Sequence, residues 1–340
     1  MSKDTLILTE RDARKLVSIR EAIPLVEEAF KLKALGRVRM PPKIYVEIPE
    51  YSGDLRIMPC YIHDKGILAA KIVTVYPLNP STRNLHTVLA TIIVLDREDG
   101  KPLAIMDGTW ITLVRTSAAG AVAVKWLAPA DARILAVIGA GRQGYGQVEA
   151  ILQVSKHIEE IRVYDIRAEA SQALASKFKE CVAVAKPVET AREAVEDADI
   201  IVTATPSRKP IIYRLWVKNG VHFNCIGADA PGKQELEPRI LMDARIFVDD
   251  LAQAIYSGEV NVPIATGILS REDIAGEIGE VIAGIKQGRL TRDEITVFVS
   301  TGLAVQDAIV ADYVYRKALE TGIGMRIEFI NDGIKAILST

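Results

Sequence analysis

The sequence lacks the features that mark several classes of protein. It has no run of about 18 uncharged apolar residues, so no membrane span is expected. Its 42 Lys and Arg residues balance 44 Asp and Glu residues, and a net charge of −2 argues against a basic protein that holds nucleic acid through its phosphates. The N-terminal stretch is charged and has no apolar core, so no signal peptide is expected. No internal repeat or low-complexity tract stands out.

Cysteine and histidine are scarce. The three cysteines (Cys60, Cys181 and Cys225) lie far apart and form no CxxC motif, so free thiols in a reducing cytoplasm are expected. The four histidines have no metal-ligand spacing, and the sequence predicts no metal site. No GxSxG or similar hydrolase signature is present.

The composition that remains is typical of a globular protein with about two domains. The chain has 340 residues, of which 49% are hydrophobic and 25% charged. In the first hundred residues, short runs rich in β-branched residues are separated by turn signals, which predicts a small, mostly antiparallel sheet. Its strands are expected at 5–8, 42–50, 55–62, 67–76 and 86–96, with helices at 19–36 and 109–127.

The pattern changes at Asp131. From there to about residue 302, short apolar runs alternate with helical stretches, which is typical of a parallel sheet with helices on both faces. The runs are 134–138, 161–164, 200–203, 223–226, 246–248 and 296–299. A last helix, 304–320, should pack back on the first domain, and no strand is expected after it. We therefore predict an α/β protein with a doubly wound, Rossmann-type NAD-binding domain at 126–304 and a discontinuous α+β domain at 1–125 and 305–340.

A glycine motif follows the first of these apolar runs. Gly139, Gly141 and Gly144 form GxGxxG between a strand pattern and a helix pattern. In such a loop the first glycine makes the tight turn, the second admits the pyrophosphate, and the third lets the helix pack on the strand. Asp165 ends the next expected strand, where an acidic residue binds the ribose hydroxyls. These features predict NAD, and Arg167 leaves NADP open because a guanidinium suits a 2′-phosphate.

Seven segments of the chain resemble the ornithine cyclodeaminase/mu-crystallin family, most closely its archaeal-type alanine dehydrogenase branch. They occur in family order and cover almost the whole chain, and several are longer than a generic dinucleotide fold explains. The segments are MPPKIYVE (40–47), GDLRIMP (53–59), LVRTSAAGA (113–121), GAGRQGYGQ (139–147), TATPSRKP (203–210), IGADAPGKQEL (226–236) and VSTGLAVQDA (299–308).

The resemblance implies a homodimer whose active site lies in the cleft between the two domains. The domain at 1–125 and 305–340 would bind the substrate and form the dimer interface. The resemblance also implies hydride transfer to NAD from a carbon that bears an amino group, followed by reaction of the imine.

Two residues match catalytic positions of the family. Lys71 matches the active-site lysine and would act as acid or base toward the substrate nitrogen or a water molecule. Asp229 matches the catalytic aspartate and would stabilise the cationic amine or imine. From the residues alone, an edge lysine in solvent and a turn aspartate are the alternatives, although a lysine within an apolar strand needs a polar partner.

Three further cations are candidate ligands for a substrate carboxylate, with surface charges as the alternative for each. They are Arg56 and Lys43, together with Arg115, which by similarity lies near the nicotinamide or the carboxylate. In the cyclodeaminase pattern a Glu that handles the amine side of the substrate stands at the place of Arg56. An arginine there would repel the distal ammonium of ornithine, which favours alanine or a carboxylate-bearing imine.

The cofactor contacts are expected in the glycine loop, after the second parallel strand and in the segments that carry the resemblance. They are Arg115, Thr116, Gly139, Ala140, Gly141, Arg142, Gln143, Gly144, Asp165, Ile166, Arg167, Thr205, Gly227, Ala228, Asp229, Lys233 and Ser300.

The predicted function is that of a cytoplasmic, NAD-dependent L-alanine dehydrogenase that interconverts alanine with pyruvate and ammonia. Three alternatives stay open, since the fold alone does not choose among them. They are an ornithine cyclodeaminase that forms proline while recycling NAD, a cyclic ketimine reductase, and a mu-crystallin-like protein that binds NAD(P)H and a ligand with little turnover. No nucleic-acid or membrane partner is expected.

Overall fold

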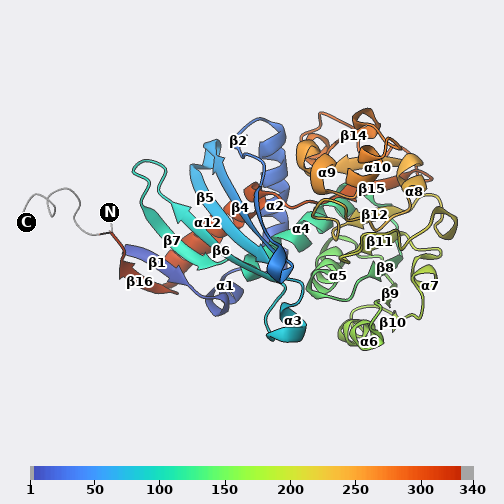
Figure 1. Ribbon diagram of the computed structural model, residues 1–340, viewed down its shortest axis with the longest axis horizontal. Coiled ribbons are helices and arrows are strands. Elements are labelled where there is room, and N and C mark those ends of the chain that lie inside the picture. The colour runs from blue at the N-terminus through green and yellow to red at the C-terminus, as the bar shows by residue number, and fades with distance from the viewer. Residues whose placement is uncertain (1–3, 331–340) are drawn as a thin grey trace, which may run out of the picture. The chain divides into compact units, whose positions relative to one another are not determined.

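The computed structural model describes residues 4–330 (Figure 1). The chain divides into two compact units, each with its own sheet. Within the part of the chain that the structure describes, no helix is both long and apolar enough to cross a membrane. The first unit comprises residues 4–25, 36–115 and 304–330, and the second comprises 26–35 and 116–303.

The first unit is built on an eight-stranded sheet in the order β16-β1-β7-β6-β5-β4-β2, with β3 paired to β4. All neighbouring strands run antiparallel except β1 and β7, as the sequence pattern predicts. Every second residue of β4 and β5 is buried. Helix α12 (Ala304–Thr321) packs against β4, β5 and β6. The strands are β1 (Asp4–Leu8), β2 (Val38–Arg39), β3 (Ile44–Ile48), β4 (Gly53–Ile62), β5 (Ile67–Val75), β6 (Val88–Leu95), β7 (Pro102–Asp107) and β16 (Met325–Glu328), and the short helices are α1 (Glu10–Leu16) and α3 (Asn79–Thr82).

The expectation that no strand follows the last helix is wrong. Strand β16 pairs antiparallel with β1, so that Asp4 lies opposite Glu328. The four residues of β16 alternate apolar and polar, but the run is too short to predict a strand and is mostly exposed, so the strand depends on a partner edge that is distant in sequence. Strand β7 and helix α1 are also absent from the sequence prediction, and α1 begins with a capping box between Thr9 and Asp12.

The second unit contains an eight-stranded sheet in which every neighbouring pair is parallel. Its order is β10-β9-β8-β11-β12-β15-β13-β14, so the chain runs outward from β8 to β10 on one side and to β14 on the other, and β15 returns to lie between β12 and β13. The strands are mostly apolar and form two cores, one on each face of the sheet. This arrangement confirms the predicted α/β, doubly wound fold. Its strands are β8 (Ile134–Ile138), β9 (Glu160–Tyr164), β10 (Val184–Pro187), β11 (Ile200–Thr203), β12 (His222–Cys225), β13 (Ala244–Val248), β14 (Ile274–Glu277) and β15 (Ile295–Val299); its helices are α5 (Arg142–Val154), α6 (Ala168–Lys177), α7 (Ala191–Val195), α8 (Pro238–Met242), α9 (Leu251–Ser257), α10 (Asn261–Ala265) and α11 (Ile278–Ile282).

The C-terminal part of α2 (Ile19–Ala34) belongs to the second unit, although the sequence pattern predicts this helix as part of the domain at 1–125. The Lys33 ammonium lies 3.0 Å from a carboxylate oxygen of Asp250. The Phe30 ring packs edge-on against the ring of Phe298, with 6.2 Å between the centroids. Through these contacts with distant segments, this part of the helix packs within the second unit.

The C-terminal half of α4 (Thr109–Leu127) also belongs to the second unit. Gly120 leaves room there for the side chain of Gln147, because a Cβ at Gly120 would lie 1.9 Å from Oε1 of that amide. The Gln147 amide donates a hydrogen bond to the carbonyl of Thr116 at 3.0 Å. The small residues of α4 therefore serve close packing, as the sequence pattern indicates.

Candidate active site

The glycine loop joins β8 to α5 and has the geometry of a dinucleotide site. Gly139 has a φ of +102°, which favours glycine, and a Cβ there would lie 2.6 Å from the carbonyl oxygen of Ala204. Gly141 caps α5, and the space where its Cβ would point is open. A Cβ at Gly144 would lie 2.1 Å from the carbonyl oxygen of Gly139, so only glycine lets the helix approach the strand. The loop thus fits a pyrophosphate at the helix N-terminus.

Asp165 follows β9 at the carboxyl edge of the same sheet. One carboxylate oxygen accepts a hydrogen bond from the backbone N–H of Ala140 at 2.8 Å, which turns the side chain toward the glycine loop. The other oxygen accepts one from the backbone N–H of Arg167 at 2.9 Å, and the Arg167 guanidinium pairs with it at 3.4 Å. The carboxylate fits the ribose hydroxyls of NAD, since it would repel a 2′-phosphate.

Three more predicted cofactor residues lie at the carboxyl ends of β11, β12 and β15. Glu235 connects the first two ends: its carboxylate accepts hydrogen bonds from the backbone N–H of Thr205 at 2.7 Å and of Gly227 at 3.1 Å. Ser300 follows β15, and its hydroxyl is buried with no hydrogen-bond partner among residues 4–330. Ligands of open parallel sheets bind at this edge.

Asp229 lies in the segment after β12 and is paired with Lys233. The Lys233 ammonium lies 2.5 Å from a carboxylate oxygen of Asp229 and 3.5 Å from the carbonyl oxygen of Gly227. The Asp229 side chain is 30% exposed, so solvent and small molecules can reach it. The structure therefore joins a predicted catalytic residue to a predicted cofactor residue.

Lys71 lies on β5 of the first unit and is 1% exposed. Its ammonium pairs with the Asp307 carboxylate of α12 at 2.7 Å and donates a hydrogen bond to the hydroxyl of Thr112 at 3.4 Å. The Arg115 guanidinium binds the second oxygen of Asp307 at 3.0 Å and the amide oxygen of Gln306 at 3.0 Å. One carboxylate is thus shared by two of the predicted functional cations.

The electrostatics of this cluster favour a neutral lysine. Burial, followed by the charge of Arg115, lowers the pKa of Lys71 from its ordinary 10.5 to about 7, although the Asp307 carboxylate opposes this shift. Lys43 also lowers the pKa of Lys71 through its charge. A lysine that titrates near neutral pH can both take and give a proton. The excess of cations suits a carboxylate ligand.

Arg56 lies on β4, and its side chain points to the same face of the sheet as that of Lys71. It is 5% exposed. Its guanidinium forms two hydrogen bonds with the Asp54 carboxylate, at 2.7 Å and 3.0 Å, and lies 5.2 Å from the ring centroid of Tyr45. The sequence predicts Arg56 as a carboxylate ligand but does not indicate its pairing with Asp54, which neutralises part of its charge.

Two buried acids, Asp307 and Glu235, belong to the site but were not among the residues predicted from the sequence. Asp307 lies in a quoted segment, VSTGLAVQDA, and an acid inside an apolar helix is a signal that it needs a cationic partner. Glu235 lies in another, IGADAPGKQEL. In residues 4–330, no three His, Cys, Asp or Glu side chains are placed to hold a metal ion. Of the other predicted cofactor contacts, Thr116 and Ala228 are buried, Arg142 and Gln143 are half-buried in the first turn of α5, and Ile166 is exposed.

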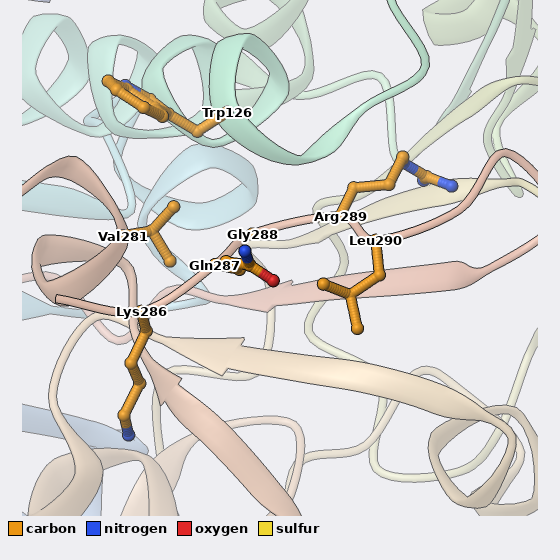
Figure 2. A pocket seen from close by; sticks show the side chains of 7 residues that line it. All are labelled: Trp126, Val281, Lys286, Gln287, Gly288, Arg289 and Leu290. Carbon is orange, nitrogen blue, oxygen red and sulfur yellow. The ribbon is translucent and has the colours of Figure 1, made fainter. Parts of the chain in front are cut away.

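A shallow pocket of about 410 Å³ lies elsewhere on the second unit (Figure 2). Its two cations are engaged: Lys286 pairs with Glu280 at 3.1 Å, and Arg289 donates to the carbonyl of Leu127 at 2.7 Å. No predicted site residue lines it, and we assign it no role. The lining residues are Trp126, Val281, Lys286, Gln287, Gly288, Arg289 and Leu290.

Comparison with known proteins gives consistent matches over nearly the whole chain. The family model described as "Ornithine cyclodeaminase/mu-crystallin family" matches residues 3–322. An alanine dehydrogenase of Archaeoglobus fulgidus is 46% identical over 326 residues, which cover 96% of this chain and 99% of that protein.

Two solved structures are similar in fold. One is an archaeal alanine dehydrogenase dimer with bound NAD, which has 45% identity and a TM-score of 0.92 and matches 96% of this chain and 100% of that one. The other is the Delta(1)-pyrroline-2-carboxylate reductase of Thermococcus litoralis in complex with NADH and L-proline. It has 38% identity and a TM-score of 0.92, and matches 95% of this chain and 100% of that one.

Proposed function

The chain belongs to the ornithine cyclodeaminase/mu-crystallin family, and on that premise we propose that it is an NAD-dependent L-alanine dehydrogenase. It would convert alanine, water and NAD to pyruvate, ammonia and NADH, and would also catalyse the reverse reaction. The observation that carries the proposal is the buried Lys71, which shares Asp307 with Arg115 and has a pKa of about 7. Such a lysine suits proton transfer at an amine or imine nitrogen near neutral pH.

Each group has a proposed role. Arg115, Lys43 and Arg56 bind the substrate carboxylate, and Lys71 takes the proton from the amine or from the attacking water. Asp229 stabilises the positive charge on the amine or imine nitrogen. The glycine loop and Asp165 would hold NAD, which would supply the acceptor for the hydride on the carbon that bears the amine.

The first unit supports a short substrate. A guanidinium on β4, close to the lysine cluster, disfavours a second ammonium on the substrate, although Asp54 reduces this effect. This is the reason to rank a cyclodeaminase below the dehydrogenase. A cyclic imine carboxylate reductase is the second candidate, favoured by the 38% identity to the pyrroline-2-carboxylate reductase, because its substrate also carries a carboxylate and an imine nitrogen.

The test is a set of absorbance assays for NADH with purified protein. Alanine with NAD should produce NADH, and pyruvate with ammonia should consume it. Lys71→Ala and Asp229→Ala should abolish both reactions while NADH still binds. Consumption of NADH with pyrroline-2-carboxylate, but not with pyruvate and ammonia, would replace the proposal by the reductase. Proline formed from ornithine without net NADH would replace it by the cyclodeaminase.

We also propose that the protein is a homodimer that pairs through the outer face of the first sheet. This face is opposite to the one that carries Lys71, and it presents the row Ile44, Ile57 and Ile72 across β3, β4 and β5. Ile44 is 55% exposed and Ile72 38%. An apolar row of this kind is typical of an interface, and the archaeal relative is described as a dimer.

Light scattering during size-exclusion chromatography tests the dimer. The wild type should elute as a dimer, and Ile72→Asp should elute as a monomer, because a carboxylate would be buried in the interface. Leu319→Asp is the matched control, since Leu319 is a similarly exposed apolar residue on α12. Ile72→Asp eluting as a dimer would show that another surface pairs.

A further inference from the structure

A buried carboxylate holds together two loops at the carboxyl edge of the second sheet. Glu235 is fully buried. It accepts hydrogen bonds from both the backbone N–H and the hydroxyl of Thr205, each at 2.7 Å, and from the backbone N–H of Gly227 at 3.1 Å. A Cβ at Gly227 would lie 2.6 Å from a Glu235 carboxylate oxygen, so glycine is required for this contact. Three donors converge on one side chain.

The position of these loops relates them to one half of a dinucleotide. The strand order reverses at β8, with β9 and β10 on one side and β11 and β12 on the other. In doubly wound folds the two mononucleotide halves lie on opposite sides of this switch point. The glycine loop and Asp165 serve the adenosine side, so Thr205 and Gly227, after β11 and β12, belong to the nicotinamide side.

A second buried acid, Glu259, binds the backbone of Glu235. Glu259 accepts hydrogen bonds from the backbone N–H groups of Glu235 at 2.8 Å and of Leu236 at 2.7 Å, and its other oxygen has no hydrogen-bond partner among the described residues. Burial and the neighbouring Glu235 carboxylate raise the pKa of Glu259 well above its ordinary value. Burial raises the pKa of Glu235 as well, but the hydrogen bonds from Thr205 oppose this shift. Glu235 has three donors and Glu259 has two, so Glu235 is the acid of the two whose charged form is better stabilised.

The remaining charges of this segment cancel. Asp229 and Lys233 form an ion pair at 2.5 Å. With Glu259 neutral, Glu235 supplies the one net negative charge within residues 226–236. The Arg208 guanidinium donates to the carbonyl of Pro231 at 3.2 Å from outside this segment, and its charge is the same in all variants compared below. Oxidised nicotinamide carries a positive charge and reduced nicotinamide carries none, and a fixed anion in a buried site discriminates between them.

We propose that Glu235 is a positioning and specificity residue of the cofactor site, whose buried negative charge at the nicotinamide side favours binding of oxidised NAD over NADH. The inference rests on the proposed function, because it requires that NAD binds to the second unit. It assigns to Glu235 a role toward the cofactor in addition to the tie between the two loops.

The test compares the dissociation constants of NAD and NADH, each measured by titration calorimetry on the full-length protein. Glu235→Gln keeps the size of the side chain and removes the charge. A unit charge within about 10 Å should change the ratio of Kd for NAD to Kd for NADH by about tenfold at the effective dielectric of a protein site. We expect this ratio to rise about tenfold in Glu235→Gln.

Glu259→Gln is the matched control. It replaces a neutral acid by a neutral amide and should leave the ratio within about twofold of the wild type. If Glu235→Gln weakens both cofactors by the same factor, the residue only holds the loops, and the inference is overturned. If the wild type binds neither NAD nor NADH, the proposed function fails instead, and the two failures are distinguishable.

A second variant acts in the opposite direction and does not alter Glu235. Lys233→Met removes the counter-charge of Asp229 and adds one net negative charge to the same segment. The ratio should then fall about tenfold by the same reasoning. This variant still tests the inference if Glu235→Gln does not fold. An unchanged ratio in Lys233→Met would show that charge in this segment has no effect on binding of the nicotinamide, and the inference would be overturned.

Discussion

Replacing Asp307 by Asn should move the proton-transfer pKa of the enzyme. The Asp307 carboxylate lies 2.7 Å from the Lys71 ammonium and 3.0 Å from the Arg115 guanidinium, and its side chain is 2% exposed. Asparagine has the same shape but no charge. Without the carboxylate, the charged form of Lys71 loses its stabilising partner while burial and Arg115 continue to oppose it. The pKa of Lys71 must therefore fall below its wild-type value of about 7.

The size of this fall follows from the ion pair. Two charges at about 4 Å and an effective dielectric of about 20 interact by about 4 kcal/mol, and the asparagine oxygen would recover part of this energy. A net loss of about 3 kcal/mol corresponds to about two pH units, since each unit is worth about 1.4 kcal/mol. The pKa of Lys71 should then lie near 5. The free energy of unfolding should also drop by about 3 kcal/mol, because Arg115 loses a buried partner.

The assay is the pH dependence of kcat/KM for alanine oxidation. In the wild type we expect kcat/KM to rise with pH through an apparent pKa near 7, and in Asp307→Asn we expect this apparent pKa near 5. Asp312→Asn is the control, because Asp312 lies on the same helix but pairs at 2.7 Å with Arg316, whose side chain is 63% exposed. An apparent pKa that stays near 7 in Asp307→Asn would refute the claim that this carboxylate sets the pKa of Lys71.

Three other outcomes follow from the structure. The pKa of Lys71 is about 7 in the folded chain and ordinarily 10.5, so between these pH values the unfolded chain binds more protons and the free energy of unfolding rises with pH. Lys71→Met should remove a few kcal/mol of this rise in urea titrations from pH 7 to 9, and an equal rise in wild type and variant would contradict this pKa. Gly144→Ala should lower the free energy of unfolding by about 1–3 kcal/mol and abolish NADH binding, because the new Cβ would lie 2.1 Å from the Gly139 carbonyl oxygen. Gly141→Ala should weaken NADH binding without lowering Tm, because its Cβ would point into open space. Asp165→Ser should raise kcat/KM with NADPH relative to NADH by about tenfold or more, because the carboxylate that repels a 2′-phosphate is gone, and an unchanged ratio would place the specificity elsewhere.

Local patterns were sufficient for most of the fold. The patterns predicted β8 and α4 at their observed bounds, because β8 is an unbroken run of five apolar residues and α4 is a long stretch rich in small and apolar residues. The glycine motif was also predictable from the sequence, because its spacing depends only on the contact between one strand and the helix that follows it. Strands β10 and β14 were missed because they are four residues long and partly polar.

The shared carboxylate could not be predicted in the same way. Asp307 is 192 residues from Arg115, and the two meet only in the folded chain, where α12 packs against β4, β5 and β6 of the first sheet. The pairing of β16 with β1 has the same character, since it joins the two ends of the described chain. Such contacts leave no periodic signal in either segment.

The sequence by itself determined the class of fold, the dinucleotide loop and the identity of most residues proposed to act, because these depend on neighbours along the chain and on segments that resemble a family. Tertiary structure alone decided the burial, the ion pairs and the protonation of those residues. It buried Lys71 beside one acid and two cations, paired Arg56 with Asp54, and gave Glu235 its three donors. Protonation and charge depend on distances between segments, and these distances exist only in the folded chain.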